Sequence, residues 1–367
     1  DNLLAASMLP VIREKYQTAK IVVVCQQFNA ELYDACPFVD QVVPFERTRV
    51  YADESYRKQL LDQLRALHAD LALNSVYSRE PLTDMLATGC DAGQRIAFNS
   101  HHFNLMTLTD RDRFNAFYSE LLSGGSTHKP ELERHRDFLA GIGLEAPPLQ
   151  PMIWITAEDE RFADDFFRKE NLRKETTIAL FAGSKWKEKI YLDYGKALAL
   201  VCKERAFSII AIGAANDREI NQQNLDATGV RALNLSGQMT LRQTAAILKR
   251  CRLAVGADTG LAHMASAVGT PHVIILGGGH FGRFLPYSPL TSVVCLPLEC
   301  YGCSWNCKYP TPHCIQGISH EVISKAMVET FARDSAKPRL FVQGESPLNS
   351  VPGMPPWQAF DEFLDPA

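Results

Sequence analysis

Residues 253–279 read LAVGADTGLAHMASAVGTPHVIILGGG, and this stretch decides the fold expected for the second half of the chain. It begins with a short apolar run, continues through a turn of small and polar residues, and then shows apolar residues at helical spacing. Gly269 and Pro271 end that helix, and a second apolar run rich in β-branched residues follows. The order of strand, turn, helix and strand is typical of one βαβ unit in a parallel sheet.

The turn of this unit predicts a binding site for an anion. Either Asp258 or Thr259 can cap the helix, and Gly260 allows the backbone to approach a ligand closely. The free N–H groups of Thr259, Gly260 and Leu261 then point toward one place at the positive end of the helix dipole, which suits phosphate best. His263 lies in the first turn, on or near the same rim. The alternative is an ordinary capped helix of an α/β protein.

The same alternation of strands and helices runs through the whole chain and predicts an α/β protein of two domains. We expect one domain over residues 1–150, a second over 151–334 and a tail or linker over 335–367, with the Pro-rich stretch 146–151 as the interdomain linker. The predicted strands are 21–25, 39–44, 71–74, 95–98, 177–181, 208–212, 231–235, 253–255, 272–276 and 292–295. The predicted helices include 3–17, 53–67, 81–88, 109–122, 130–142, 157–171, 192–204, 216–225, 241–249 and 319–331.

The beginning of the chain lacks one expected element. A doubly wound domain normally opens with a strand and a Gly-rich turn before its first helix. Here the helix over residues 3–17 comes first, so we expect that the chain is truncated or begins at an internal point of a longer protein.

The composition argues against several classes of protein. The 38 Lys and Arg residues are balanced by 42 Asp and Glu residues, which gives no indication of a nucleic-acid partner. No apolar run approaches the roughly 20 residues of a membrane span, and no signal peptide is visible. Most of the ten cysteines are scattered singly, which suits a reducing compartment such as the cytoplasm.

The loop at 182–189 follows a predicted strand and offers a second set of groups for a phosphate. Gly183 and Ser184 supply an N–H group and a hydroxyl, and the three lysines of the loop supply positive charge. Ligands of open α/β sheets bind at the carboxyl ends of the strands, so this loop and the turn at 258–263 together suit a diphosphate. A solvated charged loop is the alternative.

Four cysteines cluster near the end of the second half, with the pattern Cys300-x2-Cys303-x3-Cys307-x6-Cys314. Four thiolates in a tetrahedral arrangement suit zinc or iron. Such a site leaves no open position for catalysis, so we expect its role to be structural. The alternatives are a disulfide pair, or reduced thiols packed around Trp305.

With these motifs, the chain resembles glycosyltransferase family 9, the group of ADP-heptose:lipopolysaccharide heptosyltransferases. The strongest match is DTGLAH at 258–263, and LSGQMTL at 235–241 resembles the segment that leads to it in the family. The loop at 183–191 and the segment CPFVDQVVPF at 36–45 are similar to the family as well. The resemblance covers about residues 1–332.

The resemblance implies a GT-B architecture, in which two Rossmann-like domains face each other across a cleft. The N-terminal domain would bind the acceptor, and the C-terminal domain would bind a nucleotide-diphospho-sugar. Asp217 would lie near the ribose and Met239 near the base, although Asp217 is equally explained as a carboxylate at a helix start. The implied donor-binding residues are Ser184, Lys189, Asp217, Met239, Asp258, Thr259, Gly260, Leu261 and His263.

The resemblance also implies direct displacement with inversion. The family opens its first helix with a Gly-Asp pair whose Asp is the catalytic base, and Asp1 takes that place here. Asp1 would remove the proton from an acceptor hydroxyl, and its oxygen would attack the anomeric carbon as the diphosphate leaves. No cofactor or catalytic metal is implied.

The implied donor is ADP-heptose or another nucleotide sugar, and the implied acceptor is lipopolysaccharide or another glycan, lipid-linked or protein acceptor. The implied location is the bacterial cytoplasm, with peripheral contact to the inner membrane. After the last strand of the βαβ unit, LGGGH at 276–280 replaces the Phe-Gly-Pro-Thr that is usual in the family, so the identity of the sugar stays open.

Two other classes of function remain as alternatives. A non-catalytic metal-binding assembly module on the same fold would bind metal at the cysteine cluster and transfer no sugar. A nicotinamide-linked oxidoreductase would share the fold class, but the chain lacks the G-x-G-x-x-G fingerprint of dinucleotide binding.

Overall fold

The computed structural model describes residues 2–99, 111–126, 129–285, 288–332 and 338–344, together with the backbone of 365–366. The chain forms two compact units, one of residues 8–149 and the other of residues 1–7 with 150–367. The division after residue 149 falls in the Pro-rich stretch that was expected as the linker.

Residues 1–7 belong to the C-terminal unit and not, as expected, to the first domain. Helix α1 (Asn2–Ala5) packs against α13 (Gly260–Ala267). In addition, the N–H group of Met152 donates to the carbonyl oxygen of Leu3 at 3.0 Å. These contacts tie the first described residues to the unit that carries the predicted anion site.

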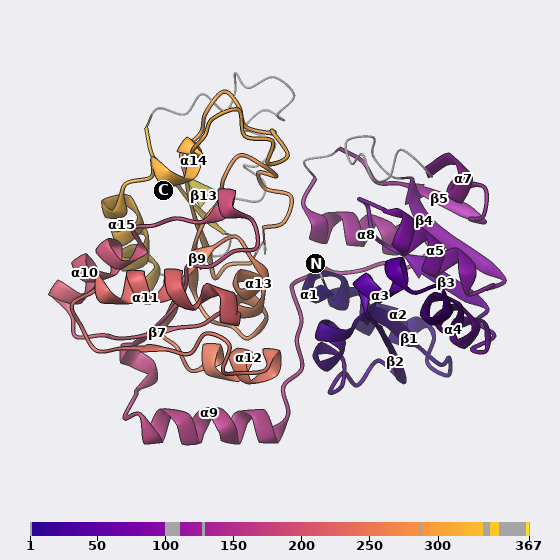
Figure 1. Cartoon of the computed structure of the whole chain (residues 1–367), viewed down its shortest axis with the longest axis horizontal. Helices are drawn as coiled ribbons and strands as arrows, with labels where there is room; N and C mark the ends of the chain where they lie inside the picture. The colour runs from indigo at the N-terminus through magenta and orange to yellow at the C-terminus, as the bar shows by residue number, and fades with distance from the viewer. Residues whose placement is uncertain are drawn as a thin grey trace. The chain divides into compact units, whose positions relative to one another are not determined.

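The C-terminal unit is built on one parallel sheet with the strand order β13-β12-β11-β10-β9-β6-β7-β8 (Figure 1). Helices α10, α11 and α15 form one packed group, and α12 packs against both α9 and α13. The strands are β6 (Thr177–Phe181), β7 (Ser208–Ala211), β8 (Ala232–Asn234), β9 (Leu253–Ala257), β10 (His272–Ile275), β11 (Thr291–Cys295), β12 (Arg339–Val342) and β13 (Asp365–Pro366). The helices are α9 (Ala157–Lys169), α10 (Tyr194–Glu204), α11 (Arg218–Asp226), α12 (Leu241–Lys249), α14 (His313–Gln316) and α15 (His320–Phe331), with short 3-10 turns η4 (Lys187–Lys189) and η5 (Ala215–Asp217) among the connections.

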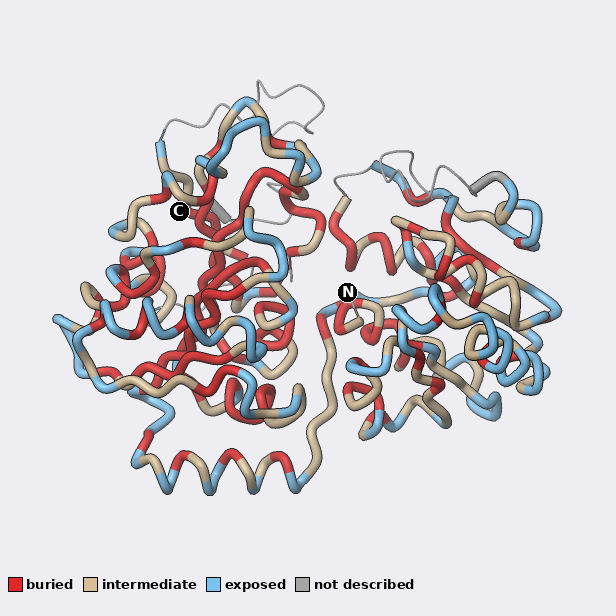
Figure 2. Tube along the Cα trace, viewed as in Figure 1, coloured by how far each residue is buried: buried red, intermediate tan, exposed pale blue. Residues whose placement is uncertain are grey.

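The centre of this sheet is apolar along whole strands. Every residue of β6, β9, β10 and β11 is buried, as the red segments of Figure 2 show. Parallel strands that are covered on both faces need such continuous burial, so short apolar runs predict them well. The predicted strand at 177–181 and the predicted helix at 241–249 coincide with β6 and α12.

The N-terminal unit contains two smaller parallel sheets, β1-β2 and β3-β4-β5. Apolar residues of β2, α3, α4 and α5 form a common core, with Val43, Val50 and Leu64 almost wholly buried. The strands are β1 (Val22–Gln26), β2 (Gln41–Phe45), β3 (Leu71–Asn74), β4 (Gln94–Asn99) and β5 (Glu120–Ser123). The helices are α2 (Leu9–Lys15), α3 (Arg47–Ala52), α4 (Glu54–Arg65), α5 (Pro81–Gly89), α7 (Arg111–Asn115) and α8 (Glu131–Gly141).

The predicted helix over 109–122 is wrong at its C-terminal end. Helix α7 ends at Asn115, and β5 follows as a third strand beside β4. The N–H group of Ser119 donates to the carbonyl oxygen of Arg95 at 2.8 Å, which starts this pairing. Residues 120–123 pair with the edge of β4 although their local pattern favours a helix, because strand pairing satisfies backbone groups of both segments.

Two further differences concern the ends of the chain. The predicted helix over 3–17 is divided into α1, a 3-10 turn and α2, with Pro10 in the first turn of α2, where its missing N–H group is tolerated. The segment 335–367 is more than a tail, since β12 pairs with β11 and adds a strand to the sheet.

Within the described ranges, we find no helix with the length and apolar composition that crossing a bilayer demands.

Candidate functional site

The candidate site lies where β9 meets α13. Thr259 adopts an extended conformation (φ −138°, ψ 179°) immediately before α13 begins, and its side chain makes no capping hydrogen bond. The expected cap is also not made by Asp258, because Lys189 engages its carboxylate. In the first turn, the N–H groups of Gly260 and Leu261 have no acceptor within the helix, whereas that of Ala262 donates to the carbonyl oxygen of Thr259 at 3.1 Å. A methyl group at Gly260 would meet no atom within 4 Å, so these N–H groups border open space that suits an anion.

A buried ion pair joins this turn to the loop after β6. Lys189 Nζ donates one hydrogen bond to Asp258 Oδ2 and another to the Asp258 carbonyl oxygen, both at 2.9 Å. The Lys189 side chain is 15% exposed and that of Asp258 is 4% exposed, so the pair is largely shielded from water. Because β6 and β9 are neighbours in the sheet, their loops meet at the same carboxyl edge. The two phosphate-binding features that the sequence predicts therefore lie together.

Three polar atoms near this turn are buried without a hydrogen-bond partner among the described residues. They are the hydroxyl oxygens of Thr259 and Tyr194 and the Nδ1 atom of His263. Burial raises the pKa of Tyr194, and neighbouring Tyr191 and Asp258 raise it further. Buried polar atoms are nearly always hydrogen-bonded, so this group of unpaired atoms indicates a place where a ligand or ordered water completes the bonding.

His263 lies in the first turns of α13, as expected, and its side chain is buried. It is 4% exposed, and burial lowers its pKa to about 3, with the Lys189 ammonium adding to the shift and the Asp258 carboxylate opposing it. The imidazole is therefore neutral at pH 7 and offers a hydrogen bond without a charge.

Trp305 belongs to the site although the sequence analysis assigned it no ligand-binding role. Its ring lies 5.0 Å from Lys189 Nζ, in cation–π contact. The N–H groups of Gly302 and Ser304 donate to the carbonyl oxygens of Gly278 and Gly279, at 2.7 and 2.9 Å, and so hold the cysteine-rich loop in place. A methyl group at Gly279 would come within 2.2 Å of the Trp305 ring. The glycine run after β10 was the one sequence signal that an aromatic side chain packs there.

The other predicted donor-binding residues follow neighbouring strands at the same edge of the sheet. The Ser184 hydroxyl accepts a hydrogen bond from the N–H group of Trp186 at 3.2 Å. The Asp217 carboxylate accepts one from the N–H group of Ala214 at 2.8 Å, which is the helix-start role named as its alternative. Met239 is half-buried in the turn before α12. Their position suits a nucleotide that extends from the α13 turn across β6 and β7.

The cysteine-rich loop was expected to hold a structural metal ion. Within the described residues, no group of three or more His, Cys, Asp or Glu side chains is arranged to hold a metal ion. Burial raises the pKa of Cys314 to about 11, and the charges of Cys300, Cys303 and Cys307 add to the shift, so the four thiols are neighbours. The expected zinc or iron site, and the assembly-module alternative that depends on it, stay predictions.

Asp1, the predicted catalytic base, lies outside the described residues. The helix that follows it, α1, packs against α13, whose N-terminus forms the anion site. The sequence alone gave no reason to expect this contact between the start of the chain and the C-terminal unit.

This chain is similar to known heptosyltransferases in sequence and in structure. The sequence profile of glycosyltransferase family 9 (heptosyltransferase) matches residues 99–310. The lipopolysaccharide core heptosyltransferase OpsX of Haemophilus influenzae is 27% identical over 159 residues, which are 43% of this chain and less than half, 45%, of that protein. Lipopolysaccharide heptosyltransferase 2 of Escherichia coli is 27% identical over 287 residues, 76% of this chain and 79% of that protein. The structure of the E. coli ADP-heptose lipopolysaccharide heptosyltransferase II superposes with a TM-score of 0.65 at 16% identity, over 90% of this chain and 94% of that chain, and confirms the predicted α/β, GT-B fold class.

Replacing Lys189 tests the anion site. We expect Lys189→Met to weaken the binding of inorganic pyrophosphate by about tenfold to a hundredfold, since a charge-assisted hydrogen bond contributes about 1.5–3 kcal/mol. Isothermal titration calorimetry measures the change. Lys203→Met, which removes an exposed charge from α10, is the control and should bind as the wild type does.

Lys189→Met also leaves the Asp258 carboxylate buried without its partner, which is destabilising. The double variant Lys189→Met/Asp258→Asn should recover thermal stability but not pyrophosphate binding. Recovery of both would contradict the role given to Lys189.

Protonation of His263 should make the protein less stable in mild acid. The folded imidazole has a pKa of about 3, whereas an unfolded histidine has one near 6.5, so the unfolded state binds more protons between these values. The unfolding free energy therefore falls as the pH decreases below 6.5, by about 2 kcal/mol at pH 5 from this group. In urea unfolding, the unfolding free energy of His263→Gln should fall between pH 7 and 5 by about 2 kcal/mol less than that of the wild type. An equal fall in both proteins would contradict the low pKa of His263.

Proposed function

The chain belongs to glycosyltransferase family 9, and on that basis we propose that it transfers heptose from ADP-heptose to a saccharide of lipopolysaccharide. Family membership agrees with the predicted class of enzyme, a glycosyltransferase. The choice of donor and acceptor draws support from two relatives that are lipopolysaccharide heptosyltransferases and from a structural relative named for ADP-heptose.

The observation that carries the proposal is the Lys189–Asp258 ion pair at the uncapped N-terminus of α13. A nucleotide sugar carries two negative charges on its diphosphate, and these need N–H groups together with a fixed cation. The first-turn N–H groups, the unpaired Thr259 hydroxyl and Lys189 supply them. Ser184, Asp217 and Met239 would then contact the rest of the donor, with Asp217 near the ribose and Met239 near the base.

In the proposed reaction, Asp1 acts as the general base. The Asp1 carboxylate takes the proton of an acceptor hydroxyl, and the hydroxyl oxygen forms a new bond to the anomeric carbon of the donor sugar. The bond from that carbon to the diphosphate oxygen breaks, the configuration inverts, and the nucleoside diphosphate leaves. The packing of α1 on α13 supports this assignment, because it keeps the start of the chain with the donor-binding helix.

In the proposed reaction, the turn before α13 stabilises the negative charge of the leaving diphosphate. The leaving diphosphate gains negative charge as the bond breaks, and the helix N-terminus and Lys189 would stabilise that charge. Neutral His263 adds a hydrogen-bonding group without competing as a cation or as a second base. We propose no metal ion and no cofactor for this chemistry.

The proposed site of action is the cytoplasm, at the inner membrane where the acceptor is lipid-linked. The ten cysteines are all unpaired, in agreement with this reducing compartment.

Thermal unfolding with a panel of nucleotides tests the donor. We expect ADP and ADP-heptose to raise the melting temperature, because a ligand at a hundred times its Kd stabilises the native state by about 2.7 kcal/mol. UDP, GDP and their sugar conjugates should have a much smaller effect. Stabilisation by UDP or GDP compounds alone would contradict the donor, and no stabilisation by any member would contradict the function.

The role of Asp1 is tested by Asp1→Asn. Transfer from ADP-heptose should fall by a factor of about 10²–10⁴, the usual contribution of a general base, while ADP-heptose still raises the melting temperature. Glu14→Gln, which changes an exposed carboxylate on α2, serves as the control and should retain full activity. Wild-type turnover in Asp1→Asn would remove Asp1 from the mechanism.

A further inference from the structure

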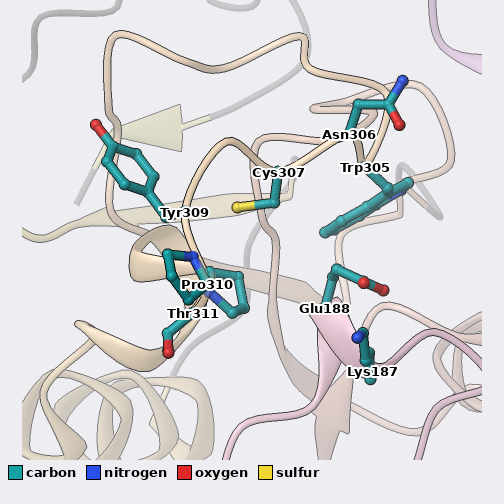
Figure 3. Close-up of a pocket in the computed structure, with 9 residues that line it drawn as sticks. Lys187, Glu188, Trp305, Asn306, Cys307, Tyr309, Pro310 and Thr311 are labelled. Carbon is teal, nitrogen blue, oxygen red and sulfur yellow. The ribbon is translucent and has the colours of Figure 1, made fainter.

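We propose that a second pocket of the C-terminal unit, beside Lys189, binds a pyranose ring. The pocket has a volume of about 550 Å³ and is formed by η4 and by residues 305–312 of the cysteine-rich loop. Figure 3 shows Trp305, Glu188 and Lys187 on one side of it and Tyr309, Pro310 and Thr311 on the other. This inference rests on the proposed function, since it concerns a sugar that takes part in the transfer.

The walls of the pocket offer flat apolar surfaces. The rings of Trp305 and Tyr309 and the prolines 310 and 312 line it. Tyr309 is 40% exposed, and its ring meets the His313 ring edge-on at a centroid distance of 4.9 Å. A pyranose has an apolar face of C–H groups that packs on such rings, so exposed aromatic side chains in a pocket favour a sugar over a fully polar ligand.

The same pocket offers hydrogen-bonding groups of both kinds. Asn306 and Thr311 can donate and accept, Glu188 accepts and Lys187 donates. Within the part of the chain that the structure describes, none of these four side chains makes a hydrogen bond or an ion pair. Sugar hydroxyls both donate and accept, which matches this mixed set.

The position of the pocket connects it to the donor site. Lys187 and Glu188 line the pocket, and Lys189, the next residue of the same turn, binds Asp258. The Trp305 ring is shared, because it lines the pocket and lies over the Lys189 ammonium. A ring in this pocket is therefore a neighbour of the diphosphate site. It is either the sugar of the donor or a sugar of the acceptor.

Tyr309→Ala and Asn306→Ala test the pocket and leave the Lys189–Asp258 ion pair unchanged. Both residues are exposed and neither contacts Lys189, so the variants should fold and respond to ADP as the wild type does. Kinetics are measured with ADP-heptose as donor and heptose-deficient lipopolysaccharide as acceptor. We expect each variant to raise one KM by about tenfold, the effect of one stacking contact or hydrogen bond. Lys203→Ala, which removes an exposed side chain on α10, is the control and should leave both KM values unchanged.

A rise in the KM for ADP-heptose assigns the ring to the donor, and a rise in the KM for lipopolysaccharide assigns it to the acceptor; either result supports the pocket. Unchanged KM values in both variants, or an equal loss of the ADP-induced thermal shift, would overturn it.

Saturation-transfer NMR with methyl heptoside keeps the pocket testable if no transfer is found. A signal in the wild type that Tyr309→Ala abolishes supports the sugar site even if the proposed reaction fails. Absence of that signal in the wild type, or its persistence in Tyr309→Ala, overturns the sugar site whatever the enzyme does.

Discussion

The ion pair between Lys189 and Asp258 is the contact on which the site depends. Asp258 stands directly before the helix N-terminus and would be a natural cap, yet its carboxylate binds Lys189 and leaves the N–H groups of Gly260 and Leu261 without a side-chain cap. The pair thus places a cation beside free backbone donors, the combination that a diphosphate requires. Because both side chains are largely buried, water does not compete strongly for either partner, and the geometry is kept before a ligand arrives.

The parallel sheet makes this pair possible. Strands β6 and β9 are far apart in sequence but adjacent in the sheet, so the loops that leave their carboxyl ends meet. The glycine run after β10 adds a third element, since it has room for the Trp305 ring that covers Lys189. The strand order therefore brings together the candidate anion site, the Trp305 ring and the neighbouring pocket, and the strands themselves form a rigid, buried base.

The cysteine-rich loop carries a spacing that is typical of a metal site. Among the described residues, no group of three or more His, Cys, Asp or Glu side chains is arranged to hold a metal ion, so the metal stays a prediction. Backbone hydrogen bonds hold the loop against the glycine run. Its thiols are near enough to influence one another, and its aromatic residues face the donor loop and the pocket. In this structure the loop contributes to the site through Trp305 and Tyr309.

The sequence by itself determined the α/β fold class, most strands of both units and the strand-turn-helix at 253–267 that carries the candidate anion site, because each depends on local apolar runs and turn residues. It also carried the resemblance to the family that the comparisons bear out. Strand β5, the burial of His263, the partner of Asp258 and the packing of α1 on α13 depended on the tertiary structure. Each results from a contact between segments distant in the chain, and local periodicity carries no information about which distant segment will provide the missing hydrogen bond, charge or apolar surface.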